Sequence, residues 1–176
     1  MDVVQRILEG LDALGVSYDL ARHPPVHTME ECAVPERILG GVMPKNLFLR
    51  PRRQEEFYLC VTRPDAVFRT SQVSRQAGSS RLGFASEEEL WARLQARPGA
   101  AGPLALMLEE AKEVSLLVDE RLRDEQRLIF HPCVSDHSLA LSGKDFFERF
   151  LPAVGRPVTW VSLSPDGDLD QSMQMI

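Results

Sequence analysis

Lysine is rare in this chain, so the position of each lysine is informative. Of 20 basic residues, 17 are arginines and only three are lysines, namely Lys45, Lys112 and Lys144. Lys45 follows Met43-Pro44 and directly precedes the apolar run from Asn46 to Leu49. We therefore expect it at the entrance of a buried strand, where loops deliver functional groups from a rigid scaffold. A protonated ammonium there can bind a phosphate or a developing oxyanion. The alternative is a solubilising lysine at a strand end.

A second candidate is the loop Gly99-Ala100-Ala101-Gly102-Pro103, which consists of small residues. Small side chains let backbone N–H groups approach a ligand closely. The alternative is a plain connecting loop between two elements.

Histidines and cysteines give little support for a metal or nucleophile site. His131-Pro132-Cys133 with His137 matches no common zinc spacing. The sequence contains no Gly-x-Ser-x-Gly elbow and no Walker loop, and Gly40-Gly41 lacks the context of a dinucleotide fingerprint. The three cysteines, Cys32, Cys60 and Cys133, are scattered and odd in number, so we expect small core residues in a reducing compartment. The sequence thus predicts a site without a metal, a cofactor or a nucleophile triad.

The arginines suggest a local basic patch on an acidic protein. The net charge is −6, which argues against coating nucleic acid through bulk charge but permits such a patch. Its candidates lie within about thirty positions in the first half: Arg50, Arg52, Arg53, Arg63, Arg69, Arg75 and Arg81. Solvated surface arginines are the alternative.

The hydrophobic pattern predicts one α+β domain. Helical spacing and caps indicate helices over 3–14, from Thr28 to near Pro35, over 71–77, from the Ser86/Glu89 capping box to Leu94, and over 144–153. Strands are expected over 17–22, 46–49, 57–62, 104–108, 114–118, 127–130, 139–142 and 158–161, with 46–49 and 57–62 as a hairpin. The order favours a mixed, largely antiparallel sheet flanked by helices.

The length of 176 residues fits a single domain over 1–162, followed by a polar, flexible tail over 163–176. No apolar stretch reaches the roughly 18 residues of a membrane span, and no signal peptide is visible. We therefore expect a cytoplasmic protein.

Five blocks of this sequence occur in an order that resembles one known family. They are His23-Pro24-Pro25-Val26 with Thr28-Met29-Glu30-Glu31, Pro44-Lys45-Asn46-Leu47-Phe48-Leu49, Arg81-Leu82-Gly83-Phe84-Ala85-Ser86, Pro98-Gly99-Ala100-Ala101-Gly102-Pro103, and Phe130-His131-Pro132. Over about residues 1–162 the chain resembles the YbaK/ProX family of free-standing prolyl-tRNA editing proteins. The resemblance implies a YbaK-like fold and an aminoacyl-tRNA deacylase, similar to the editing insertion domain of bacterial prolyl-tRNA synthetases.

The resemblance also implies roles for single residues. Lys45 matches the functional lysine of the family, which would anchor the terminal adenosine phosphate or the ester carbonyl. Gly99 and Pro103 match its Gly-x-x-x-Pro loop, which with Ala100, Ala101 and Gly102 between them would hold the aminoacyl group. His131 would form a polar wall or orient water, although a purely structural histidine is equally compatible, and Asn46 would fix the lysine. Ala100, Ala101 and Gly102 are smaller than the residues of similar proteins, which leaves the preferred amino acid open.

These implications lead to a metal-independent editing hydrolase with Ala-tRNA(Pro) as the first expected substrate. A proline pocket excludes the smaller alanine weakly, because each missing methylene costs only about 1–3 kcal/mol. The alternatives are another mischarged tRNA such as Cys-tRNA(Pro), or a tRNA- or synthetase-binding module without turnover. The expected partners are the tRNA acceptor end and prolyl-tRNA synthetase. The acceptor end is expected in a groove formed by Lys45 and some of Arg50, Arg52, Arg69, Arg75 and Arg81.

Overall fold

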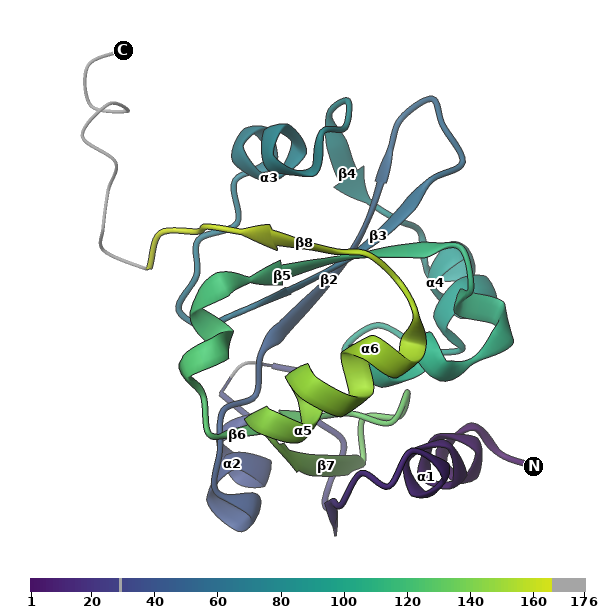
Figure 1. Cartoon of the computed structure of the whole chain (residues 1–176), viewed down its shortest axis with the longest axis vertical. Helices are drawn as coiled ribbons and strands as arrows, with labels where there is room; N and C mark the ends of the chain where they lie inside the picture. Colours follow the sequence, from purple (N-terminus) through teal and green to yellow (C-terminus); the bar gives the residue numbers. More distant parts are fainter. Residues whose placement is uncertain (29, 166–176) are drawn as a thin grey trace.

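The computed structural model describes residues 1–28 and 30–165, whose strands form two sheets (Figure 1). The three-stranded sheet has the order β1 (Asp19–Arg22), β7 (His137–Ser142) and β6 (Arg127–Phe130). The five-stranded sheet has the order β4 (Leu82–Phe84), β2 (Lys45–Pro51), β3 (Phe57–Thr62), β5 (Val114–Asp119) and β8 (Val158–Val161). Only the pairs β3/β5 and β5/β8 are parallel. This confirms the predicted α+β fold with a mixed, largely antiparallel sheet.

Helices flank both sheets. The α-helices are α1 (Val3–Ala13), α2 (Ala33–Leu39), α3 (Thr70–Ala77), α4 (Glu87–Leu94), α5 (Gly143–Asp145) and α6 (Leu151–Val154). A π-helical turn over Phe146–Phe150 joins α5 to α6, so the chain is helical from 143 to 154, as the sequence predicts for 144–153. Three 3₁₀ turns are η1 (Pro103–Met107), η2 (Glu109–Ala111) and η3 (Glu120–Asp124).

The five-stranded sheet is buried on both faces. On one face, Val73 of α3 packs in a small cluster with Leu49 and Leu117. On the other face, the main core joins Phe48 and Leu59 to α1, α4, the helical segment 143–154 and the three-stranded sheet. Burial of this core supplies most of the driving force for folding. β2 contributes residues to both clusters. Figure 1 shows it running from the upper part of the molecule toward α2 and β6.

Two local predictions were wrong. The run 104–108 was expected as a strand, but Pro103 begins the 3₁₀ turn η1 instead. A short buried apolar run does not distinguish a strand from a buried turn by its pattern alone. Second, Thr28 and Glu31 make the reciprocal bonds of a capping box, but α2 begins only at Ala33 and contains Pro35 in its first turn rather than ending there. Proline is tolerated in a first turn, because the N–H it lacks has no intrahelical partner there.

The described part of the chain extends three residues past the predicted boundary at residue 162. Leu163 is buried, and the N–H of Val67 donates to the carbonyl of Ser164 at 2.9 Å. The rest of the expected tail, 166–176, lies outside the described residues. Within the described ranges, no helix has both the length and the apolar character that crossing a membrane requires.

Candidate functional site

The site is built around the first residues of β2. Strand alternation places Lys45, Leu47 and Leu49 on the α3 face of the sheet, whereas Asn46 lies on the opposite face. β3 pairs with β2 along its whole first half, but β4 pairs only with its last three residues, Leu49 to Pro51. Within 1–28 and 30–165, the β2 edge at Lys45 to Leu47 therefore has no strand partner.

A cavity of about 250 Å³ opens at this end of β2. Its lining residues come from four separate parts of the sequence and are Cys32, Met43, Pro44, Lys45, Asn46, Leu47, Gly99, Ala101 and His131. The structure thus brings together the predicted lysine, its neighbouring asparagine, two residues of the small-residue loop and the predicted histidine. The ammonium and the loop share one cavity, which is the juxtaposition that the sequence-based hypothesis requires.

Lys45 presents a partly unsatisfied ammonium to this cavity. Its Nζ donates to the carbonyl of Ala66 at 3.0 Å. An ammonium has three N–H donors, so two remain for a ligand. The loop that carries Ala66 is held in turn by Asp119, whose Oδ2 accepts from the N–H of Arg63 at 3.2 Å. The side chain is half-buried, so its charge acts in a partly desolvated setting.

Asn46 contributes a free acceptor. Its Nδ2 donates to the carbonyl of Pro44 at 3.3 Å, and its Oδ1 is buried without a partner among the described residues. The expectation that Asn46 fixes the lysine is not what the structure shows, because the amide bonds to Pro44. A buried unpaired carbonyl oxygen costs about 1–3 kcal/mol, so it is a natural place for a ligand N–H.

The small-residue loop contributes only part of its length to the cavity. Gly99 and Ala101 line it, whereas Ala100 and Pro103 are buried and Pro103 starts η1. Gly102 is also outside the lining, in an extended conformation beside the carbonyl of His131. Gly99 has φ +86°, a conformation that side-chain-bearing residues rarely adopt. The glycine therefore fixes the path of the loop past the cavity.

His131 ends a chain of buried hydrogen bonds. Its Nδ1 lies 2.8 Å from the carbonyl oxygen of His137 and 3.4 Å from Oγ of Ser138. Oγ of Ser138 lies 2.7 Å from Nε2 of His23, whose Nδ1 lies 2.8 Å from the carbonyl of Pro24. Carbonyls only accept, so both Nδ1 atoms carry a hydrogen. Nε2 of His131 is left with its lone pair.

The surroundings keep His131 neutral. Burial lowers the pKa of His131, and the neighbouring His23 lowers it further, while the bond to the His137 carbonyl and the charge of Asp136 oppose both effects. Burial disfavours the charged form of an imidazole, and here that effect is the largest. At neutral pH the side chain therefore offers an acceptor nitrogen at the cavity.

Comparison with known proteins decides the family. A profile described as "Aminoacyl-tRNA editing domain" matches residues 23–148. The chain belongs to this aminoacyl-tRNA editing family. The resemblance to YbaK/ProX proteins is thereby confirmed, as is the prediction that the protein is an aminoacyl-tRNA deacylase.

Two curated relatives and one solved structure extend this editing domain match. The prolyl-tRNA editing protein ProX of Acetoanaerobium sticklandii is 31% identical over 163 residues, covering 93% of this chain and 99% of its own. A prolyl-tRNA synthetase associated domain-containing protein 1 of Danio rerio is 31% identical over 153 residues, covering 86% and 82%. The crystal structure of a candidate trans-editing enzyme for prolyl-tRNA synthetase matches the fold with TM-score 0.71 at 17% identity, covering 95% and 99%.

Four residues that line the cavity were not among the predicted site residues, namely Cys32, Met43, Pro44 and Leu47. Cys32 was expected in the core, but it is half-buried and lines the cavity. Its position directly after the Thr28-to-Glu31 block was the available signal. The other two expectations are confirmed, since Cys60 and Cys133 are buried, and burial raises the pKa of each thiol to about 12. Over the described ranges, no cluster of three His, Cys, Asp or Glu side chains could hold a metal ion.

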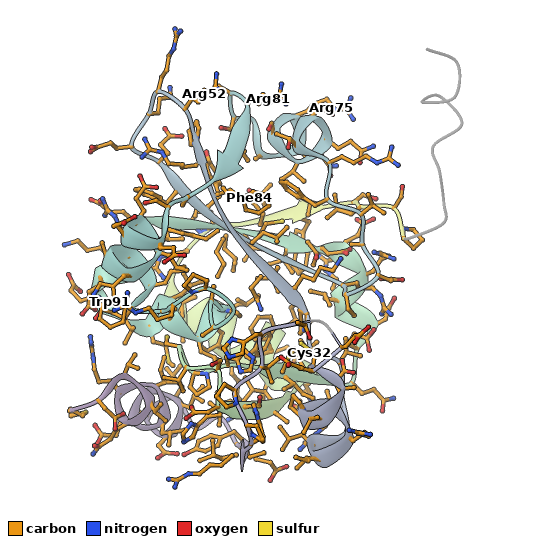
Figure 2. The ribbon with its side chains drawn as sticks, turned by 180° about the vertical axis from the view of Figure 1, so that it is seen from behind. Cys32, Arg52, Arg75, Arg81, Phe84 and Trp91 are labelled. Carbon is orange, nitrogen blue, oxygen red and sulfur yellow. The ribbon has the colours of Figure 1, made fainter. Side chains whose placement is uncertain are left out.

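The predicted arginines of the editing domain differ in position and exposure. Arg50 is on the opposite face of β2, where it pairs with Glu89 and lies 5.6 Å above the Phe57 ring. Arg69 is half-buried, and its Nη1 has no partner in the described part of the chain. The three exposed members are Arg52, Arg75 and Arg81, which Figure 2 shows at the end of the molecule away from Cys32. None of these arginines is among the described lining residues of the cavity, and the expected groove formed by Lys45 and some of them stays a prediction.

Proposed function

We propose that this editing domain hydrolyses mischarged tRNA(Pro) in trans, with Ala-tRNA(Pro) as its preferred substrate. The observation that carries the proposal is the cavity that combines the free N–H donors of Lys45 with the unpaired Oδ1 of Asn46. These two groups complement the two polar ends of an aminoacyl ester. The name of the ProX relative, a prolyl-tRNA editing protein, supports tRNA(Pro) as the nucleic acid.

Each part of the substrate has a complementary group in the cavity. The α-ammonium of the amino acid donates to Oδ1 of Asn46, which has no other donor among the residues that the structure describes. The ester carbonyl or the terminal phosphate accepts from Nζ of Lys45. The amino acid side chain packs against the apolar part of the lining, formed by Met43, Leu47 and Ala101.

The reaction needs only a positioned water and charge stabilisation. Water forms a bond from its oxygen to the ester carbon, and the carbonyl oxygen gains negative charge that the Lys45 ammonium stabilises. Nε2 of His131 orients this water. The bond from carbon to the ribose oxygen then breaks, and the proton lost by water passes to that oxygen, giving the free amino acid and intact tRNA. The neighbouring ribose hydroxyl of the substrate is available to assist this proton transfer.

Discrimination in this cavity rests on the shape and donor count of the amino group. A volume of about 250 Å³ also accommodates the ester and part of the ribose, so size alone is not the filter. Alanine offers a primary ammonium with three N–H donors, whereas proline offers two on a rigid ring. Oδ1 of Asn46 therefore favours the primary ammonium of alanine. When a ring carbon of proline is directed at this oxygen, the oxygen stays unpaired, and the affinity for the prolyl ester is lower.

A panel of purified substrates tests this function. Ala-tRNA(Pro), Cys-tRNA(Pro) and Pro-tRNA(Pro) are each incubated with the full chain, and release of the amino acid is followed. We expect Ala-tRNA(Pro) to be hydrolysed fastest and Pro-tRNA(Pro) to be spared. Faster hydrolysis of Cys-tRNA(Pro) would favour the alternative substrate. Binding of all three without release would favour a non-catalytic module.

The His131 environment predicts the pH dependence of this activity. Because the pKa of His131 is lowered, its neutral form persists at pH 7, and kcat/KM should fall only below pH 6.5, the ordinary histidine value. The same sign applies to stability: the unfolded chain takes up the proton first, so stability decreases as pH falls below about 6.5. A pH profile of His131→Ala checks this. It should lack the acidic limb of the wild type, and an unchanged limb would remove His131 from the mechanism.

The exposed arginines supply the tRNA contact of this proposal. Arg52, Arg75 and Arg81 are retained as phosphate-binding residues, whereas Arg50 and Arg69 are already engaged or half-buried. Phosphate contacts of this kind position a nucleic acid without reading its sequence. Association with prolyl-tRNA synthetase is the second proposed partnership, in line with the names of the relatives.

A further inference from the structure

An aromatic ring stands exposed on the edge strand of the larger sheet. Phe84, the last residue of β4, is 66% exposed, more than Trp91, which is 43% exposed. Its ring is tilted against the ring of Phe68, with the two centroids 5.5 Å apart. Phe68 packs in turn on the buried cluster beneath α3. The ring of Phe84 is thus supported from below while most of its surface remains open.

Exposed arginines lie at the end of the molecule beyond this ring. Arg75 and Arg81 line a polar cavity of about 570 Å³ together with the hydroxyls of Thr70, Ser71, Ser74 and Ser79. Figure 2 places Arg52, Arg81 and Arg75 along one end of the molecule, with Phe84 between them and Cys32 of the Lys45 cavity. Arg52, Arg75 and Arg81 are exposed and form no ion pair with a carboxylate of residues 1–28 or 30–165. Their charge is therefore free for an anionic ligand.

The ring of Phe84 lies on the same face of the sheet as Lys45 and Leu47, two of the residues that line the cavity. Phe84 is paired directly with Leu49, and the alternation of β2 puts Leu49 on the same side as Leu47 and Lys45. Leu49 lies four positions after Lys45 along β2, which corresponds to a distance of about 13 Å along the strand. That length corresponds to no more than about four stacked nucleotides. β4 ends at Phe84, so the open edge of β2 leads from the ring to the cavity.

We propose that Phe84, backed by Phe68, is a stacking platform for an unpaired base of the RNA whose aminoacylated end occupies the Lys45 cavity. The inference rests on the proposed function and adds a binding site to it. Every nucleobase has a π-face, so one exposed ring serves an unpaired strand of any sequence. Neighbouring free arginines match the phosphates of that strand. A protein partner, by contrast, is typically bound through a larger apolar patch than one ring.

Deacylation kinetics of three substitutions at this position test the platform. Phe84→Ala should raise KM for aminoacylated tRNA about 5- to 150-fold, the range given by loss of one stacked base, with little change in kcat. Phe84→Trp should keep KM near the wild-type value, whereas Phe84→Leu should resemble alanine, because it keeps the apolar bulk but lacks the ring face. Trp91→Ala is the matched control, since it removes another exposed aromatic ring, which Figure 2 shows away from Arg52, Arg75 and Arg81.

A binding experiment separates this inference from the proposed function. An RNA hairpin with an unpaired 3′ overhang carries the fluorescent base 2-aminopurine within the overhang and is titrated with the full chain. We expect quenching by the wild type and by Phe84→Trp, and weaker binding with reduced quenching by Phe84→Ala. If quenching depends on Phe84 but no ester is hydrolysed, the platform stands and the deacylase proposal fails. If Phe84→Ala binds and quenches like the wild type, or if the wild type itself does not bind, the platform is refuted.

Discussion

Replacing Lys45 with alanine should reduce kcat/KM for deacylation about 100- to 1000-fold. Among the described residues that line the cavity, Lys45 carries the only charged donor, and two of its three N–H groups are free for the ester. Removing one preorganised donor from a site of developing negative charge has an effect of this size. The side chain is half-buried and its single protein bond goes to the Ala66 carbonyl, so the fold should survive. Deacylation of Ala-tRNA(Pro) and a thermal melt, measured on the same sample, check both statements.

Lys112→Ala is the matched control for this experiment. Lys112 is an exposed lysine that pairs with Glu109 at 3.1 Å and lies outside the cavity. We expect unchanged kinetics. Lys45→Arg should not restore activity, because a planar guanidinium does not reproduce a compact ammonium. Wild-type activity in Lys45→Ala would remove the lysine from the proposed chemistry.

Replacing Asp119 with alanine should lower the free energy of unfolding by about 3 kcal/mol. Asp119 is fully buried at the end of β5, where its carboxylate accepts from the N–H groups of Arg63 and Arg121 and pairs with the Arg121 guanidinium at 3.1 Å. Its removal leaves two backbone donors unpaired. It also frees the loop that holds Lys45 through the Ala66 carbonyl, so deacylation should fall together with stability.

Urea unfolding of Asp119→Ala and Asp124→Ala measures this effect. Asp124 is an exposed carboxylate five residues further along the chain, and its removal should change the stability by less than about 0.5 kcal/mol. A midpoint for Asp119→Ala that equals the wild type would show that the loop is held by other contacts.

Local signals predicted most of the elements but not their pairing. The Ser86/Glu89 capping box opens α4 as expected, and the runs 46–49 and 57–62 form the predicted hairpin. The two parallel pairs, β3/β5 and β5/β8, join segments that are distant in sequence, so no turn chemistry specifies them. The run 104–108 was misassigned because its residues are all buried or nearly so and show no alternation.

The site was predicted only in part, because its residues come from segments that are distant in the sequence. Lys45, Gly99 and His131 were singled out from their sequence blocks, and the structure places all three around one cavity. Cys32 was missed because its contact with the cavity depends on how α2 packs against the three-stranded sheet. The position of Arg50 on the face opposite to Lys45 could have been predicted, because residues five apart on a strand point to opposite faces.

The central claim is that the Lys45 cavity, rather than a larger hollow on the surface, receives the aminoacyl end. A larger cavity of about 590 Å³ lies beside Arg123 and Trp160. The most direct measurement is an NMR titration of the full chain with a non-hydrolysable alanyl-adenosine amide. We predict the largest amide shifts at Lys45, Asn46, Gly99 and Ala101, and their loss in Lys45→Ala. Shifts concentrated around Trp160, with the Lys45 cavity unchanged, would contradict the account.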